Sequence, residues 1–390
     1  MTRHLLAAVL LLQGVSAWAC PICLGWGKPS TAQRLVATPQ AVLALPTADA
    51  GRFRVIEVIK GEQPAAGMVE GGYPRTGPPG DATVTDARLL LLVRDDPLPT
   101  WVILGATRAA RADWLRALAS GKRAADMSPE EWRARVALVV PHLNDPEPLA
   151  VELAYAELGA APYAALRTAK PLLDTAALRQ CLVAPELAKH HPICWLLLGI
   201  AGNVQDAATL EERLQAAWQS GDTLNLSSML AANLELSGAA RVAWIESNYL
   251  ADPKRSTPEI QAALLALSVH GNADGIIPRE RVIQAYRVFM KAHPESAGDV
   301  ATDLAAWQYW DAVPEYLALM KSGVRQQYPS RLAMLVYLQQ SPNARALGFS
   351  PEAVPADGKV ERWNKPFGSL RGFQAVPADV KAERQNPSLP

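Results

Sequence analysis

The sequence lacks an excess of charge of either sign, and it lacks long apolar segments beyond its N-terminus. Its 38 lysine and arginine residues balance 38 aspartate and glutamate residues, so the chain has no net charge at pH 7. A neutral chain lacks the electrostatic attraction that drives binding to nucleic acid, and we expect no nucleic-acid partner. The apolar run at 195–201 is far shorter than the ~18 residues that a membrane-spanning helix needs. We therefore expect no membrane span.

Cysteine is also scarce, with four residues in the whole chain. Cys20 and Cys23 form a CxxC motif, a pattern that serves as a redox pair or as half of a metal site. A thioredoxin-like site needs a strand before the motif and a zinc ribbon needs a second CxxC, and the sequence offers neither. We interpret the pair as a local disulfide or an N-terminal anchor. The alternative is a thiol- or metal-handling role through Cys20 and Cys23.

Cys181 and Cys194 lie next to His190 and His191, and these four side chains are of the types that bind zinc or copper. Their spacing is not a standard one for a metal site, and adjacent histidines usually point in different directions. Cys181 is expected near the end of one helix and Cys194 in the first turn of the next, which brings them within bridging range. We predict a Cys181–Cys194 disulfide, with two buried free thiols as the alternative, and expect no metal and no cofactor.

The sequence offers no combination of nucleophile, base and oxyanion donor, so we do not predict an enzyme. His142, His270 and His293 are expected at helix ends or turns without a nucleophile elbow nearby, and we interpret them as solvated or capping residues. Trp307 and Trp310 lie three positions apart. They would form either an exposed platform for sugar or peptide or, as we favour, a stack in the core between helices.

Residues 1–19 have the features of a secretory signal peptide. Arg3 supplies the positive charge, 5–12 the apolar segment, and Ala17-Trp18-Ala19 the cleavage site. We expect a periplasmic or secreted protein that begins at Cys20 after cleavage. The alternative is a lipoprotein anchored at Cys20, although Trp18 is bulky for that signal.

Residues 20–106 are predicted to form a small β-barrel or sandwich. Short segments rich in β-branched and aliphatic residues are separated by clusters of Gly, Pro and Asp, and they lie at 35–45, 53–61, 87–95 and 101–104. The stretch 71–80 is dense in Gly and Pro and is predicted to be a loop. A module of this size depends on packing against the helices that follow.

Residues 107–340 are predicted to form an α-solenoid of irregular repeats, which makes the fold class α+β and mostly α. Apolar residues recur at spacings of three and four in short segments that Gly, Asn, Asp or Pro separate. Helices this short are marginal alone in water and must bury their apolar faces on neighbours, as stacked repeats do. Residues 341–390 contain seven prolines and are predicted to be a tail that packs along the array or frays.

Four helical segments resemble those of bacterial secreted HEAT-like repeat proteins of uncharacterised function, in which a small β module precedes the helices; they lie at 150–163, 193–210, 305–319 and 330–338. The β module distantly resembles netrin-like modules with an OB-type barrel, but it lacks their further disulfide cysteines. The resemblance implies a fold rather than a reaction. Because stacked repeats generally present binding surfaces, we expect an exported scaffold that binds a protein or peptide in the cell envelope.

Overall fold

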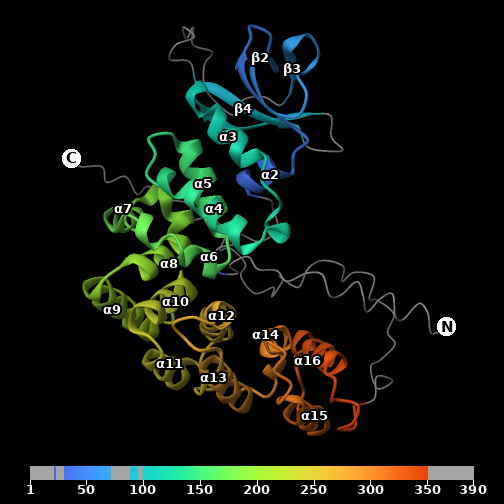
Figure 1. Cartoon of the computed structure of the whole chain (residues 1–390). Helices are drawn as coiled ribbons and strands as arrows, with labels where there is room; N and C mark the ends of the chain where they lie inside the picture. Colours follow the sequence, from blue (N-terminus) through green and yellow to red (C-terminus); the bar gives the residue numbers. More distant parts are fainter. Residues whose placement is uncertain (1–21, 23–29, 72–87, 95–99, 350–390) are drawn as a thin grey trace, which may run out of the picture.

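The computed structural model describes residues 22, 30–71, 88–94 and 100–349 (Figure 1). A five-stranded antiparallel sheet lies at one end of the molecule, and helices form the rest. This arrangement confirms the predicted α+β, mostly α, fold class. The predicted signal peptide, Cys20, Cys23, the loop after Gly71 and the tail beyond Phe349 lie outside the described residues.

The sheet has the strand order β3-β2-β1-β4-β5. Its strands are β1 (Gln40–Pro46), β2 (Arg52–Lys60), β3 (Met68–Glu70), β4 (Leu89–Arg94) and β5 (Trp101–Thr107). A parallel bridge between Gly71 and Trp101 joins the end of β3 to the start of β5, so the sheet curves back on itself. Apolar side chains fill its inside, among them Val42, Phe53 and Leu92. The short strand β3 was not predicted.

The opposite face of the sheet packs on helices. Leu43 of β1 and Leu91 of β4 belong to the same hydrophobic core as the helical part, which continues without a break past the predicted boundary at 106. Strands β1 and β4 are therefore buried on both faces, which explains the continuous apolar sequence of β4.

The predicted strand at 35–45 is wrong in its first part, because helix α2 (Thr31–Ala37) precedes β1. Ser30 caps this helix: its Oγ accepts from the Gln33 backbone N–H at 3.1 Å, and Gln33 Oε1 accepts from the Ser30 N–H at 2.8 Å. This capping box starts a helix whose Leu35 is fully buried. The local cap outweighs the β propensity of the residues that follow.

The helices after the sheet are mostly short. They are α3 (Ala112–Ala119), α4 (Pro129–Val139), α5 (Pro148–Ala160), α6 (Tyr163–Arg167), α7 (Thr175–Cys181), α8 (His191–Ala201), α9 (Val204–Ser220), α10 (Leu226–Ser237), α11 (Ala240–Ile245), α12 (Thr257–Ala273), α13 (Arg279–Ala292), α14 (Ala301–Ala306), α15 (Val313–Lys321) and α16 (Tyr328–Gln340). Ser128 and Glu131 form a capping box at the start of α4.

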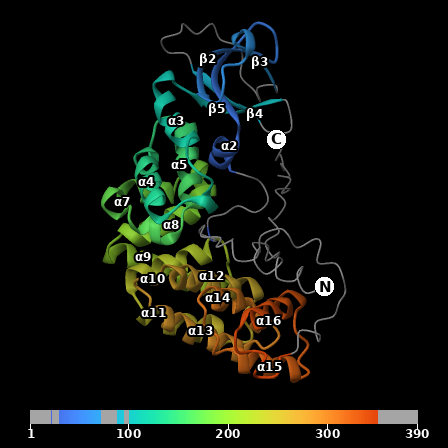
Figure 2. The same ribbon diagram turned by 45° about the vertical axis from the view of Figure 1, so that its right-hand side comes forward.

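Helices α8, α10 and α12 pack side by side in one layer, and α9, α11 and α13 lie against them in a second layer. Gly199 allows the close approach of α8 to α10, since a Cβ atom there would lie 2.6 Å from the Cα of Ala232. The stack continues from the sheet through these layers and then bends at α14–α16 (Figure 2). Each layer buries the apolar face that the next one presents.

Helix α6 lies across the first layer and contacts both α8 and α12. It also reaches α10, because the Tyr163 hydroxyl donates to Glu235 Oε2 at 3.1 Å and Arg167 Nε donates to Glu235 Oε1 at 2.9 Å. This part of the first layer is therefore covered by the chain itself.

Two histidines that we interpreted as solvated or capping are buried, so neither is solvated, although His293 does occupy the C-cap position of α13. His270 lies within α12 and is 1% exposed, and its Nε2 donates to the Ala231 carbonyl oxygen at 2.8 Å. Burial lowers the pKa of His270 to about 4, so its ring is neutral at physiological pH. His293 follows α13, stacks on Phe289 and is 4% exposed.

Candidate functional site

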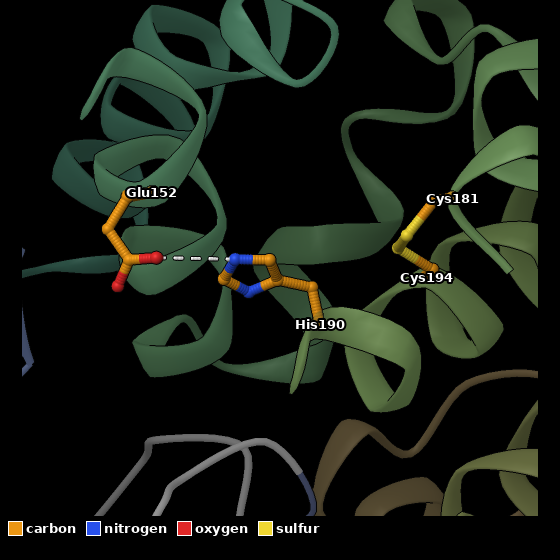
Figure 3. The surroundings of a disulfide bond; sticks show 4 residues. All are labelled: Glu152, Cys181, His190 and Cys194. Carbon is orange, nitrogen blue, oxygen red and sulfur yellow. Dashed lines mark ion pairs between the residues drawn. A yellow bond between two sulfur atoms is a disulfide. The ribbon is translucent and has the colours of Figure 1, made fainter. Parts of the chain in front are cut away.

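The two cysteines that the sequence predicts to be paired form a disulfide. Cys181 at the end of α7 and Cys194 in the first turn of α8 have Cα atoms 6.5 Å apart, and both side chains are buried (Figure 3). With both sulfur atoms bonded to each other, neither cysteine is free as a thiolate. The cysteine and histidine side chains of this region therefore cannot form a Cys₂His₂ metal cluster.

His190 points away from the disulfide and toward α5, as Figure 3 shows. Its Nε2 lies 3.3 Å from Glu152 Oε2, and its ring stacks on Tyr155 with centroids 4.5 Å apart. Lys189 pairs with the same carboxylate. The hydrogen bond from His190, helped by Lys189, lowers the pKa of Glu152 to about 2. These contacts hold the 3-10 turn η7 (Pro185–His190) against α5, which is a structural role.

Trp307 and Trp310 both pack on the core between helices, which was the favoured interpretation. Trp307 stacks on Tyr286 with centroids 5.6 Å apart, and its Nε1 donates to Asn272 Oδ1 at 2.9 Å. Trp310 lies 5.1 Å from the ring of Tyr337. Both rings are partly buried against the hydrophobic core.

An open groove lies between α9 and α11, and sequence reasoning did not indicate it. It has a volume of about 510 Å³ and is lined by Glu211, Glu212, Gln215, Ala216 and Gln219 from α9 and by Arg241 and Trp244 from α11. The lining combines one aromatic ring with amide groups and charges of both signs. This is the candidate functional site, and we refer to it as the α9–α11 groove.

Helix α9 is held firmly at both ends. At its start, the Asn203 side chain accepts from the Gln205 and Asp206 backbone N–H groups, and Asp206 caps in return. Arg179 of α7 clamps Asp206 with two hydrogen bonds of 2.7 and 2.9 Å. At its end, Gly221 adopts the left-handed conformation, with φ of +73°, that stops a helix cleanly. The wall of the groove that α9 forms is thus a rigid one.

Helix α11 runs directly into a π-helical turn, η8 (Glu246–Leu250). Asn248 Nδ2 donates to the Trp244 carbonyl oxygen at 2.8 Å and supplies a hydrogen bond where the regular ladder is interrupted. Arg281 of α13 fixes Glu246 with two bonds of 2.5 and 2.7 Å. Trp244 lines the groove, while Tyr249 beyond it is fully buried.

A continuous stack of rings and guanidinium groups backs the groove. The Arg241 Cζ lies 4.3 Å from the Trp244 ring, and Trp244 meets Tyr249 edge-on at 5.6 Å. Behind them, the Arg255 Cζ lies 5.6 Å from the Tyr249 ring and 4.6 Å from the ring of Trp218, a residue of α9. Attraction between cations and ring faces holds such a stack together. The stack therefore links the two walls of the groove.

Arg241 is the charged group whose orientation is best defined in the groove. Its Nε donates to Asn233 Oδ1 at 2.7 Å, and Asn233 is fully buried in α10. Its Nη1 lies 3.7 Å from Glu211 Oε1, which is beyond hydrogen-bond distance. Within the described part of the chain, the terminal nitrogens of Arg241 thus have no hydrogen-bond acceptor. The plane of the Arg241 guanidinium is fixed, and its terminal N–H groups can still donate hydrogen bonds to a ligand.

The sequence carried one weak signal for this site, the Arg241 and Trp244 pair one helical turn apart within a predicted helix. The groove needs Gln215 and Gln219 on a different helix, and no local pattern says that these residues face Trp244. No group of three side chains of the metal-binding types comes together in the residues that the structure describes. No described helix has the length and apolar character needed to cross a bilayer. No protein-family model, curated protein or solved structure matches this chain.

Proposed function

We propose that this protein is an exported interaction scaffold that binds a segment of a protein or peptide in the cell envelope through the α9–α11 groove. The observation that carries the proposal is Arg241, which Asn233 and Trp244 hold in one orientation at the groove. Its terminal nitrogens make no hydrogen bond within the described residues, and the exposed Glu211 pairs with it only at 3.7 Å. Arginine and tryptophan are the side chains most enriched among those that dominate binding energy in protein interfaces.

The lining of the groove suits an extended peptide. Gln215 and Gln219 lie one turn apart on α9, and their side-chain amides offer donors and acceptors for a peptide backbone. Trp244 adds an apolar surface with little conformational entropy to lose. An open groove of this kind accommodates a chain that enters and leaves at its ends.

Export is part of the proposal and has separate support. The buried Cys181–Cys194 disulfide is typical of proteins that fold in an oxidising compartment. The strand order β3-β2-β1-β4-β5, with the bridge between Gly71 and Trp101, agrees with the OB-type barrel that the netrin-like resemblance implies. The paired helical layers agree with the HEAT-like resemblance.

The proposal is tested by selecting random short peptides on the protein and counter-selecting on an Ala216→Trp variant. Ala216 is exposed and lines the groove, so a tryptophan there fills the groove without disturbing the core. The matched control is Ala208→Trp, an exposed position on α9 that does not line the groove. We expect enriched peptides that bind the native protein and the control but not Ala216→Trp. Peptides that bind all three proteins equally would contradict the groove as the site.

A further inference from the structure

We infer, building on the proposed function, that the α9–α11 groove selects peptide segments that carry a single carboxylate, which Arg241 binds through its two terminal nitrogens. The carboxylate belongs either to an Asp or Glu side chain or to the C-terminus of the partner. Both sources present the same planar pair of oxygens, which a guanidinium recognises through two parallel hydrogen bonds.

Other arginines of this molecule show what Arg241 lacks. Arg135 holds Glu157 through bonds of 2.7 and 2.9 Å, and Arg179 holds Asp206 in the same way. Arg281 holds Glu246 with bonds of 2.5 and 2.7 Å. Each of these side chains uses its guanidinium to clamp a carboxylate of the chain itself. Arg241 is equally well oriented, but among the described residues its carboxylate partner is Glu211, which forms an ion pair at 3.7 Å without a hydrogen bond.

The orientation of Arg241 is fixed before any ligand arrives. Its Nε bond to the buried Asn233 fixes one edge of the guanidinium, and the Trp244 ring fixes its plane. Its side chain is 21% exposed, so most of its conformational freedom is already lost on folding. A carboxylate that binds there therefore costs little further ordering.

Glu211 and Glu212 restrict the choice further. Both are exposed on the α9 side of the groove, and Glu211 lies 3.7 Å from Arg241 without a hydrogen bond. The ligand carboxylate must displace Glu211 from Arg241, and a second acidic residue on the ligand would be repelled by Glu211 and Glu212, whereas a lysine or arginine would be attracted. The groove therefore favours an acidic group with a neutral or basic neighbour rather than a run of acidic residues.

The test uses peptides recovered by the selection described above, with binding measured by fluorescence anisotropy. In one arm each Glu or Asp is replaced by Gln or Asn, and in a second arm the C-terminal carboxylate is replaced by an amide. We expect one of these changes to weaken binding to the native protein by roughly tenfold or more, the usual loss for a hydrogen bond to a charged group. The arm that shows the loss identifies the source of the carboxylate.

The same peptide pair is then measured on Arg241→Ala and Arg241→Lys. If the guanidinium is the receptor, the difference between the two peptides disappears in Arg241→Ala and shrinks in Arg241→Lys, since an ammonium cannot form the paired bonds. The matched control is Arg213→Ala on α9. Like Arg241, Arg213 lies over a tryptophan, 5.4 Å from the Trp195 ring, but it does not line the groove. This control should keep the full difference.

Two failures are distinguishable. If groove-dependent peptides bind equally well with and without each carboxylate, the carboxylate inference is wrong while the proposed function stands. If no peptide depends on the groove, the proposed function itself fails. The peptide substitutions are measured on the native protein, so their result does not depend on whether an Arg241 variant folds.

Discussion

The region from α4 to α9 and the region from α13 to α16 differ in how they partner their buried carboxylates. In the first, Glu157 meets Arg135, Asp206 meets Arg179, and Glu152 meets Lys189 and His190. In the second, Asp303 accepts a hydrogen bond from the Tyr286 hydroxyl at 2.6 Å, and the Ser330 hydroxyl donates a hydrogen bond to Asp299. Among the described residues, neither of these aspartates has a cation as partner.

This difference reverses the effect of pH on the two regions. The hydrogen bond from His190 lowers the pKa of Glu152 to about 2. The stability that the Glu152 carboxylate contributes is therefore present when the pH is above the ordinary pKa of a glutamate, and it is lost as the pH falls toward 2. Burial raises the pKa of Asp299 to about 6. The stability that the protonated Asp299 contributes is therefore fully present when the pH is below the ordinary pKa of an aspartate, and it is lost as the pH rises through 6. Acid therefore removes the contribution of Glu152 to stability in the first region, and it restores the contribution of Asp299 in the second.

The largest expected effect comes from breaking the best-buried ion pair of the first region. Arg135→Met leaves the Glu157 carboxylate buried without its cation, and we expect a loss of about 3–5 kcal/mol in the free energy of unfolding by urea. Arg133→Met, at an exposed position on the same helix, should change little. Replacing both members, by Arg135→Met with Glu157→Leu, should restore much of the stability, and a double variant as weak as the single one would contradict the argument.

Removing the disulfide tests whether the first region owes its rigidity to ion pairs alone. Cys181→Ala combined with Cys194→Ala opens a loop with a sequence separation of 13, and the chain-entropy model predicts a loss of roughly 3 kcal/mol. The native protein without reductant is the reference in thermal unfolding followed by circular dichroism. Equal unfolding midpoints for the two proteins would show that the bridge does not constrain the unfolded chain.

A change in the second region should have a smaller effect of opposite sign. Asp299→Asn removes a carboxylate that burial disfavours, so at pH 8 we expect the free energy of unfolding to rise by on the order of 1 kcal/mol. This gain should disappear as the pH falls below the ordinary pKa of an aspartate. The measurement is the urea midpoint at both pH values. Asp311→Asn, at an exposed neighbouring position, is the control. A variant less stable than the native protein at pH 8 would refute the assignment.

The smallest effect is expected at Glu152, whose partner Lys189 is largely exposed. Glu152→Gln should lower the free energy of unfolding by about 1 kcal/mol or less at pH 7, because solvent screens much of the attraction between Glu152 and Lys189. The loss should vanish as the pH falls from 4.5 toward 2, since the native carboxylate then becomes protonated. Glu186→Gln, exposed on the turn that carries Lys189, provides the comparison. A loss that does not depend on pH would point to packing instead of charge.

Local features of the sequence determined much of the fold. The capping box at Ser128 and Glu131 places the start of α4, and apolar residues at spacings of three and four place α10, α12 and α16. The connection bracketed by Pro185 and Pro192 brings Cys181 and Cys194 together. Each of these signals acts within one or two helical turns, and for that reason a reader of the sequence alone can recognise it.

Only the tertiary structure decided which side chains are buried together and which remain available. His270 is buried because α12 lies between α10 and α13, and nothing in its own helix distinguishes it from an exposed histidine. The α9–α11 groove arises where Gly221, the π-helical turn and the Arg255 stack place Gln215 and Trp244 on the two walls of one groove. The physical reason is that burial and pairing depend on contacts between separate helices, which short-range patterns of sequence do not encode.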